Sequence, residues 1–283
     1  MGTTPPTANS RLSGKRKSRF GTVGGMKRAI IHLPRLTGLI AVSLAALLLT
    51  AVTRASNAAQ VMTPQMEAIC GTPEVDQMHT LRVKAAPLRL VAVGSSSTEG
   101  VGASRPALSY VSQLGTRLGR DWPTSTVVIN KGVSGNVLSD IVARAPRDVF
   151  ALNPNVVVVQ TGTNDAVQHV PVARYQRQLQ QFVEGLQARR IRVILVDNQY
   201  LPAQVGSAEY IGIQKATHDV AHLNHVSLVS RFGLSEAIQA QTHMQPGDLL
   251  AADGFHPNDL MHACTAKAIE VTLLGALGAQ STL

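Results

Sequence analysis

The chain has 283 residues, of which 45% are hydrophobic, 15% are charged and only 4% are aromatic. It carries 26 basic against 17 acidic residues, but nine of the basic residues and none of the acidic ones lie within positions 1–58. The high isoelectric point therefore belongs to this N-terminal segment, and neither the charge nor the few aromatic residues favour nucleic-acid binding.

The N-terminal segment, residues 1–58, has the features of an export signal. Positive charges over 26–35 precede 18 uncharged residues, 36–53, which are followed by small residues suited to cleavage. We expect the mature chain to start near Ala59 and to be periplasmic or secreted. An apolar stretch of this length also just spans a bilayer, so an anchor over 36–53 is the alternative and the one membrane contact that we expect. Met26 is an alternative start of the chain.

Residues 59–87 show weak periodicity, and we expect them to form a surface extension of a single domain, 88–283. Within this domain, apolar β-branched runs alternate with longer amphipathic segments. The expected strands are 88–93, 126–130, 155–160, 191–197 and 226–229, and the expected helices are roughly 106–120, 137–151, 172–190, 208–223 and 260–277. The alternation predicts a three-layer α/β/α fold with a mainly parallel, flavodoxin-like sheet of about five strands.

Four short polar motifs lie at the ends of these elements. Three of them follow the first three strands: GSSSTEG at 94–100, NKGVSGN at 130–136 and GTND at 162–165. The fourth, DGFHPN at 253–258, precedes the last helix. Because parallel strands bring their carboxyl ends to one edge of the sheet, we expect the first three motifs to share a crevice. The fourth enters it if the last helix packs back onto the sheet.

Two of the motifs carry residues suited to nucleophilic catalysis. A serine at a strand-to-helix turn can act as a nucleophile, although such a turn can equally serve only to cap a helix. Asp253 and His256 are three residues apart, so a tight turn can let the carboxylate accept from the Nδ1–H group and leave Nε2 as a base. In the alternative reading Asp253 caps a helix and His256 is merely exposed. No HExxH, CxxC or GxGxxG spacing occurs, so we expect no metal or nucleotide cofactor.

Together the four motifs resemble the blocks of the SGNH hydrolases, also called GDSL esterases and lipases. The family's first block places the nucleophile at Ser96 rather than at a neighbouring serine. The later blocks align their glycine with Gly135, their asparagine with Asn164 and their acid–base pair with Asp253 and His256. The resemblance implies a Ser-His-Asp triad. It also implies an oxyanion hole formed by the backbone N–H groups of Ser96 and Gly135 and by the side-chain amide of Asn164.

The sequence departs from the family at Ser95, where an aspartate is common. That aspartate is not part of the triad, so catalysis is not excluded, but the subfamily stays open. We expect an exported hydrolase of carboxylic esters, acting on short acyl or O-acetyl groups of a small molecule or polysaccharide. The alternatives are an acyltransferase that uses a sugar hydroxyl as acceptor, and a non-catalytic ligand-binding protein, against which the intact triad argues.

Substrate recognition is weakly marked in the sequence. The loop 197–202 after the fourth expected strand is expected to border the pocket and to offer hydrogen bonds to a polar acyl acceptor. Arg105 and His169 could contribute as well, although a solvated surface position is favoured for both. The chain contains two cysteines, Cys70 and Cys264. An oxidising compartment favours a disulfide between them, and two separate buried thiols are the alternative.

Overall fold

The computed structural model describes residues 62–72 and 86–278, with side chains described up to residue 275. The expected leader and anchor, residues 1–58, lie outside the described residues. Over the described ranges, none of the helices is both long enough and apolar enough to cross a membrane.

Five parallel strands form the central sheet. They are β1 (Leu88–Gly94), β2 (Thr126–Gly132), β3 (Val156–Gln160), β4 (Arg192–Val196) and β5 (Ser227–Val229). Their order in the sheet is β2-β1-β3-β4-β5, and every neighbouring pair is parallel. This is the flavodoxin-like order, so the predicted fold class is confirmed, and each expected strand overlaps an observed one.

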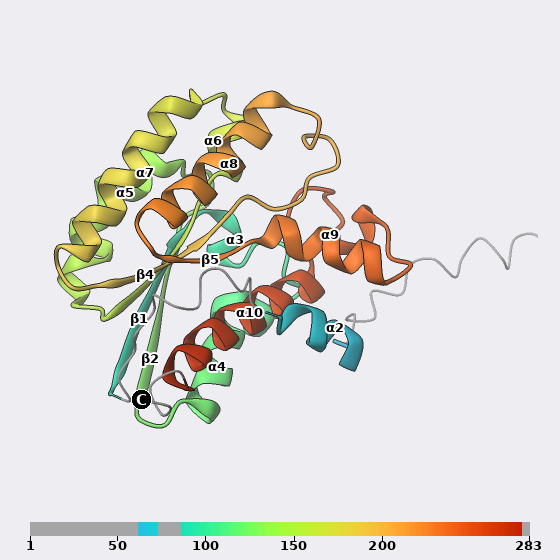
Figure 1. Cartoon of the computed structure of the whole chain (residues 1–283). Coiled ribbons are helices and arrows are strands. Elements are labelled where there is room, and N and C mark those ends of the chain that lie inside the picture. Colours follow the sequence, from blue (N-terminus) through green and yellow to red (C-terminus); the bar gives the residue numbers. More distant parts are fainter. Residues whose placement is uncertain (1–61, 73–85, 279–283) are drawn as a thin grey trace, which may run out of the picture. The chain divides into compact units, whose positions relative to one another are not determined.

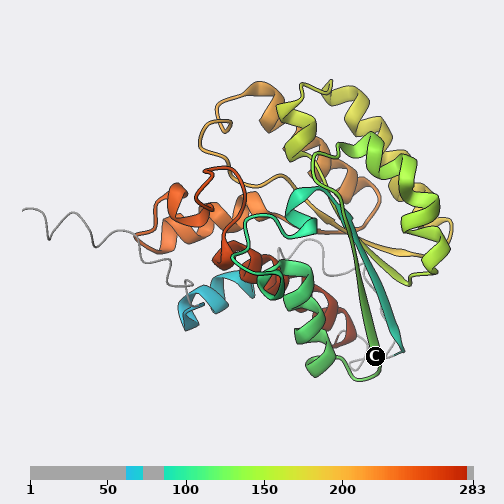
Figure 2. The same ribbon diagram turned by 180° about the vertical axis from the view of Figure 1, so that it is seen from behind.

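Helices cover both faces of the sheet, as Figure 1 shows and as the view from behind in Figure 2 also shows. One face is covered by α5 (Leu138–Asp148), α7 (Val172–Gln187) and α8 (Ala208–Leu223). The other face is covered by α4 (Tyr110–Asp121) and α10 (Asp259–Gly278). Because all five strands are parallel, their carboxyl ends lie along one edge of the sheet.

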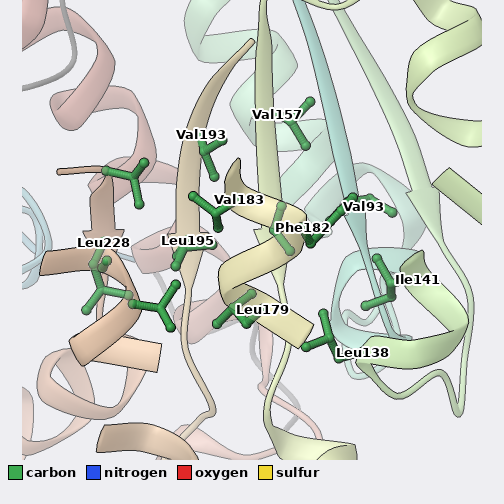
Figure 3. Close-up of a cluster of buried hydrophobic side chains, with 14 of the residues drawn as sticks. Val93, Leu138, Ile141, Val157, Leu179, Phe182, Val183, Val193, Leu195 and Leu228 are labelled. Atoms are coloured by element: carbon green, nitrogen blue, oxygen red, sulfur yellow. The ribbon is translucent and has the colours of Figure 1, made fainter. Parts of the chain in front are cut away.

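The alternation of side chains along the strands explains this burial. In β3, Val157 and Val159 face the layer of α7, whereas Val156 and Val158 face α4 and α10. All five residues of β3 are buried, which is typical of a strand covered on both faces. Figure 3 shows side chains of α7 packed against valines and leucines of the strands. This apolar packing fixes the strand ends that carry the polar motifs.

Several short elements were not expected or divide an expected helix. The expected helix at 106–120 is a 3₁₀ turn followed by α4, and that at 137–151 is α5 followed by a 3₁₀ turn. These two turns are η2 (Pro106–Leu108) and η3 (Phe150–Leu152). The elements not predicted are α2 (Pro64–Cys70), α3 (Ser96–Glu99), α6 (Thr163–Val167), α9 (Arg231–Gln241) and the 3₁₀ turn η4 (Pro246–Leu249).

The described part of the extension, α2, is attached to the domain. Met66, Ile69 and Cys70 are buried in a cluster with apolar residues of α9 and α10. Cys70 is joined to Cys264 of α10 by a disulfide, with the two Cα atoms 5.0 Å apart. One face of α2 therefore belongs to the core rather than to the surface.

Candidate active site

The first motif forms a sharp turn between β1 and α3. A Cβ atom on Gly94 would lie 2.2 Å from Oγ1 of Thr98, so only glycine allows the strand to end this close to the helix. Asn130 donates a hydrogen bond to the Thr98 carbonyl over 2.7 Å, which ties α3 to β2. The turn places Ser96 at the first position of α3, with 7% of its surface exposed.

The fourth motif forms a tight turn in which the Asp253 carboxylate bonds to Phe255 and His256. One carboxylate oxygen accepts from the backbone N–H groups of Phe255 and His256, both over 2.9 Å. Gly254, which lies between Asp253 and Phe255, has a φ of 65°, a backbone conformation that favours glycine. An isolated antiparallel bridge between Leu250 and Pro257 closes the base of the turn. The turn holds the imidazole of His256 against the carboxylate of Asp253.

Ser96, His256 and Asp253 form a continuous line of hydrogen bonds. His256 Nε2 lies 3.0 Å from Ser96 Oγ, and His256 Nδ1 lies 2.6 Å from the second carboxylate oxygen of Asp253. A carboxylate at Nδ1 favours the tautomer with its proton on that nitrogen, which leaves Nε2 to accept the Ser96 proton. Burial alone would raise the pKa of Asp253, but the bonds from His256 and Phe255 outweigh it and lower the pKa to about 2. The carboxylate is therefore ionised at neutral pH.

The second and third motifs meet beside this line. Gly135 has a φ of 80°, and its carbonyl accepts from the side chain of Gln168 at the end of α6 over 3.2 Å. Asn164 Nδ2 donates to the carbonyl of Asn136 over 3.0 Å, and an amide nitrogen carries a second hydrogen for another acceptor. Asp165 accepts from the backbone N–H of Leu138 over 2.9 Å. These bonds clamp the loop after β2 to α6.

A second set of contacts joins the loop after β2 to the turn that carries Ser96. Ser134 donates both its N–H, over 2.8 Å, and its hydroxyl to the Glu99 carboxylate. The guanidinium of Arg144 donates to the carbonyls of Gly94 and Lys131, each over 2.8 Å, and to the side chain of Asn136 over 2.7 Å. Arg144 was not predicted as a site residue, because a basic residue on a helix carries no local sign of such contacts.

The loop 197–202 is buried at its beginning. Asp197 and Asn198 are fully buried and Gln199 is 4% exposed, whereas Tyr200 is half-buried and Pro202 is exposed. The Gln199 side chain contacts Ser97 Oγ and donates to the carbonyl of Phe255. The beginning of this loop therefore contacts both the turn that carries Ser96 and the turn that carries Asp253 and His256.

Other expected features lie away from the line of hydrogen bonds. Arg105 and His169 are exposed, as favoured for solvated residues. A cavity of about 250 Å³ lies between α2, β5, α9 and α10, and none of the five expected site residues lines it. Within 62–72 and 86–278, no group of three or more His, Cys, Asp or Glu side chains could hold a metal ion.

A serine at a strand-to-helix turn, a histidine bonded to it and an ionised carboxylate thus lie together on a flavodoxin-like sheet, an arrangement typical of serine hydrolases. The comparison with known families agrees: the model of the non-GDSL lipase-like family matches residues 73–278, and the chain belongs to this family. The resemblance drawn from the four motifs is thus confirmed. Ser95, which departs from the Gly-Asp-Ser order, suits a family described as non-GDSL.

Individual relatives and solved structures share less than 30% sequence identity with this chain over the matched residues. The esterase TesA of Pseudomonas aeruginosa is 28% identical over 177 residues, which are 62% of this chain and 83% of TesA. The acetylxylan esterase Axe2 of Geobacillus stearothermophilus has a TM-score of 0.57 at 23% identity, covering 66% of this chain and 94% of Axe2. LAE5, an α/β hydrolase enzyme from the metagenome of Lake Arreo in Spain, has a TM-score of 0.56 at 26% identity, covering 68% and 95%.

Proposed function

We propose that this protein is an exported serine esterase that cleaves short acyl esters, including O-acetyl groups on carbohydrates, through an acyl-enzyme intermediate. The protein is an enzyme that hydrolyses ester bonds: it belongs to a lipase-like family, and its relative TesA is an esterase. The observation that carries the finer proposal is the line of two hydrogen bonds from Ser96 Oγ through His256 to Asp253.

The proposed reaction has two stages. Ser96 Oγ attacks the ester carbonyl carbon while its proton passes to His256 Nε2, and His256 then protonates the departing alkoxide, leaving an acyl group on Ser96. A water molecule next attacks the acyl carbon, and its proton passes through His256 back to Ser96 as the carboxylic acid leaves. Asp253 stays ionised and stabilises the imidazolium.

The oxyanion of each tetrahedral intermediate needs donors that are already in place. We assign this role to the backbone N–H groups of Ser96 and Gly135 and to the side-chain amide of Asn164. The bonds that hold the loop after β2 to α6 support this assignment, because donors fixed before the reaction need no reorganisation. Removing one such donor typically lowers kcat by ~10²–10³-fold.

The surroundings of the site favour a small acyl group on a polar alcohol. The loop after β2 and the end of α6 present polar side chains, Ser134, Asn136 and Gln168. Two partly exposed valines, Val133 and Val167, accompany them. A long acyl chain would need a continuous apolar channel, and the apolar cavity of about 250 Å³ is lined by none of these residues.

Covalent labelling with a fluorophosphonate probe tests the nucleophile. The neighbouring serines provide a matched control, because Ser95, Ser96 and Ser97 have the same hydroxyl and differ only in their place on the turn. We expect Ser96→Ala to abolish labelling and Ser97→Ala to retain it. Labelling that survives Ser96→Ala would contradict the assignment.

Transfer of the acyl group to a sugar is the second candidate, because a sugar hydroxyl can replace water in the second stage. We expect p-nitrophenyl acetate and butyrate to be cleaved faster than the octanoate ester, with free acid as the product in water. The measurement is product analysis with and without xylose as acceptor. A predominant acetylated sugar at modest xylose concentration would instead assign an acyltransferase.

Export to the periplasm or the medium is part of the proposal. The apolar segment 36–53 after a basic flank supports it, as does the Cys70–Cys264 disulfide, since disulfides persist in oxidising compartments. N-terminal sequencing of the protein from its native compartment should give a start near Ala59. A chain that retains 36–53 would indicate a membrane-anchored enzyme.

A further inference from the structure

Gln160, the last residue of β3, lies directly beneath the nucleophile turn. Its side chain is 1% exposed, and its Oε1 accepts three hydrogen bonds from that turn. The donors are the Ser95 backbone N–H over 3.1 Å, the Ser95 hydroxyl over 3.2 Å and the Thr98 hydroxyl over 2.9 Å. One oxygen therefore contacts both the residue before Ser96 and a residue of the helix that Ser96 begins.

The turn depends on such contacts because α3 has only four residues. A helix this short has too few internal hydrogen bonds to be stable alone, so contacts with neighbouring elements must hold it. The side chain of Ser95, at its N-terminus, makes no capping bond to the helix and instead bonds to Gln160. Tyr110 adds a bond to Thr98 over 2.8 Å. Gln160 thus makes three of the bonds that fix the position of Ser96.

The other end of the Gln160 amide is not satisfied in the same way. Its Nε2 is buried and has no hydrogen-bond partner among the described residues. Burying an unpaired amide nitrogen is unfavourable, but an apolar side chain at this position would leave the buried N–H group of Ser95 and the hydroxyls of Ser95 and Thr98 without this acceptor. The three bonds to Oε1 therefore offset the unpaired Nε2.

Gln160 also connects two parts of the site. It is followed within four residues by Asn164, which we assign to the oxyanion hole. The same residue therefore ends the strand that leads to Asn164 and holds the turn that carries Ser96. A shift at Gln160 would change the distance between the nucleophile and an oxyanion donor.

We infer that Gln160 is a positioning residue of the reaction, which acts through Ser95 and Thr98 to hold Ser96 in line with His256 and the oxyanion donors. This inference rests on the proposed function, in which Ser96 is the nucleophile. Gln160 does not contact the substrate, because it is almost wholly buried.

The test compares Gln160→Met, which keeps the approximate volume and removes the acceptor, with Gln160→Glu, which keeps an acceptor oxygen. Fluorophosphonate labelling rates, and kcat and KM for p-nitrophenyl acetate, are measured per folded molecule. We expect Gln160→Met to lower the labelling rate and kcat by about tenfold or more while KM changes little, because a small misplacement of reacting groups affects mainly the chemical step. We expect Gln160→Glu to restore most of the rate.

A matched control separates positioning from a general loss of stability. Thr217→Val removes a fully buried hydroxyl, which bonds to Tyr175 over 2.7 Å. Thr217 lies on α8, on the face of the sheet opposite to α4 and α10. This substitution should lower the thermal unfolding temperature without changing the labelling rate per folded molecule. If Gln160→Met does not fold, Gln160→Asn replaces it, since it keeps the amide but withdraws the oxygen by one methylene group.

Two results would overturn the inference alone: full-rate labelling of folded Gln160→Met or its replacement, and a folded Gln160→Glu that is as slow as Gln160→Met. Labelling that persists in Ser96→Ala would instead overturn the proposed function and this inference with it. The two failures are therefore distinguished by which variant shows them.

Discussion

A serine, a histidine and an aspartate come together in at least two places among the described residues, and the two places differ in which residue is central. At the end of β1 the histidine is central, because His256 bonds to both Ser96 and Asp253. At the ends of β4 and β5 the carboxylate is central. Asp197 there accepts from Ser230 Oγ over 2.7 Å and lies 3.0 Å from His218 Nε2.

This difference decides the chemistry that each set allows. Ser230 directs its proton to a carboxylate, and its oxygen accepts from the backbone N–H of Gly233, so it caps α9. The carboxylate of Asp197 also accepts from the backbone N–H groups of Arg231 and Phe232. The second set therefore joins two strand ends to a helix. The same three residue types form a catalytic arrangement only when the histidine lies between the other two.

Replacing each of the two histidines should show the largest difference in kcat between the two sets. We expect His256→Ala to lower kcat for p-nitrophenyl acetate by ~10⁴–10⁶-fold, the range found when a member of such a triad is removed. His218→Ala should leave kcat per folded molecule nearly unchanged. The measurement is steady-state hydrolysis by protein of verified circular dichroism. A large loss of kcat in folded His218→Ala would mean that the second set takes part in catalysis.

The two aspartates should separate activity from stability. Asp253→Asn removes the carboxylate that fixes the His256 tautomer, so we expect kcat to fall by ~10⁴-fold with little change in stability. Asp197→Asn weakens a fully buried acceptor of several bonds and should lower the free energy of unfolding by about 3 kcal/mol. Urea unfolding and turnover of both variants give the comparison. Unchanged turnover in Asp253→Asn would mean that this carboxylate only accepts hydrogen bonds from the turn and takes no part in catalysis.

A third histidine, His262, differs from His256 and His218 because both of its ring nitrogens bond to backbone groups. It accepts from the N–H of Tyr110 over 3.2 Å and donates to the carbonyl of Val101 over 3.1 Å. Burial lowers the pKa of His262 to about 4, so the folded chain keeps it neutral where the unfolded chain protonates it. Its contribution is complete above pH 6.5, and about 3 kcal/mol of unfolding free energy should be lost as pH falls to about 4.

The measurement is urea unfolding between pH 4 and pH 7 for the parent chain and for His262→Gln. The variant should show a weaker dependence on pH over this interval, because glutamine does not titrate. An identical pH dependence in both proteins would show that other groups cause the loss. Turnover of His262→Gln per folded molecule at pH 7 should stay close to that of the parent.

The smallest effect is expected from the close approach of the 100–105 segment to His256. A Cβ atom on Gly102 would lie 2.8 Å from the Cβ of His256 and 2.2 Å from the carbonyl oxygen of Pro257, and the φ of Gly102 is 93°. We expect Gly102→Ala to displace His256 and to lower kcat by ~10–100-fold. Gly206→Ala, where a Cβ meets nothing within 4 Å, is the control. Equal kinetics of the two variants would mean that the turn adjusts without loss.

The layers and the contact of Asp253 with His256 could be predicted because their signals are local, whereas the pairing of His256 with Ser96, 160 positions apart, followed only from the family resemblance. Strands such as β3 consist almost wholly of valine, and turns at their ends contain glycine and polar residues. Asp253 and His256 are close in the chain, so their contact depends on a single turn. The short helix α3 was missed because four residues show no helical period, and its stability comes from Gln160 and Asn130 on other strands.

The burial of Asp197 was not predicted for a similar reason. Asp197 follows the fourth expected strand, so the loop 197–202 that it begins was expected to border the pocket. Its partners His218, Ser230 and Arg231 lie 21 to 34 positions further along the chain. Arg231 is itself 2% exposed and donates to the Asp197 carbonyl. Only the packing of α8 and α9 shows that these groups bury one another, and no local pattern predicts that.

The disulfide between Cys70 and Cys264 closes a covalent ring of chain that contains Ser96, Asp253 and His256. All three members of the proposed triad therefore belong to one macrocycle, from which the N-terminal segment and the end of α10 extend as two tails. A single cleavage of the backbone anywhere in that ring leaves one covalent molecule, and only a reductant then releases two fragments. A chain that a protease cuts once within this ring therefore keeps Ser96 and His256 on the same molecule.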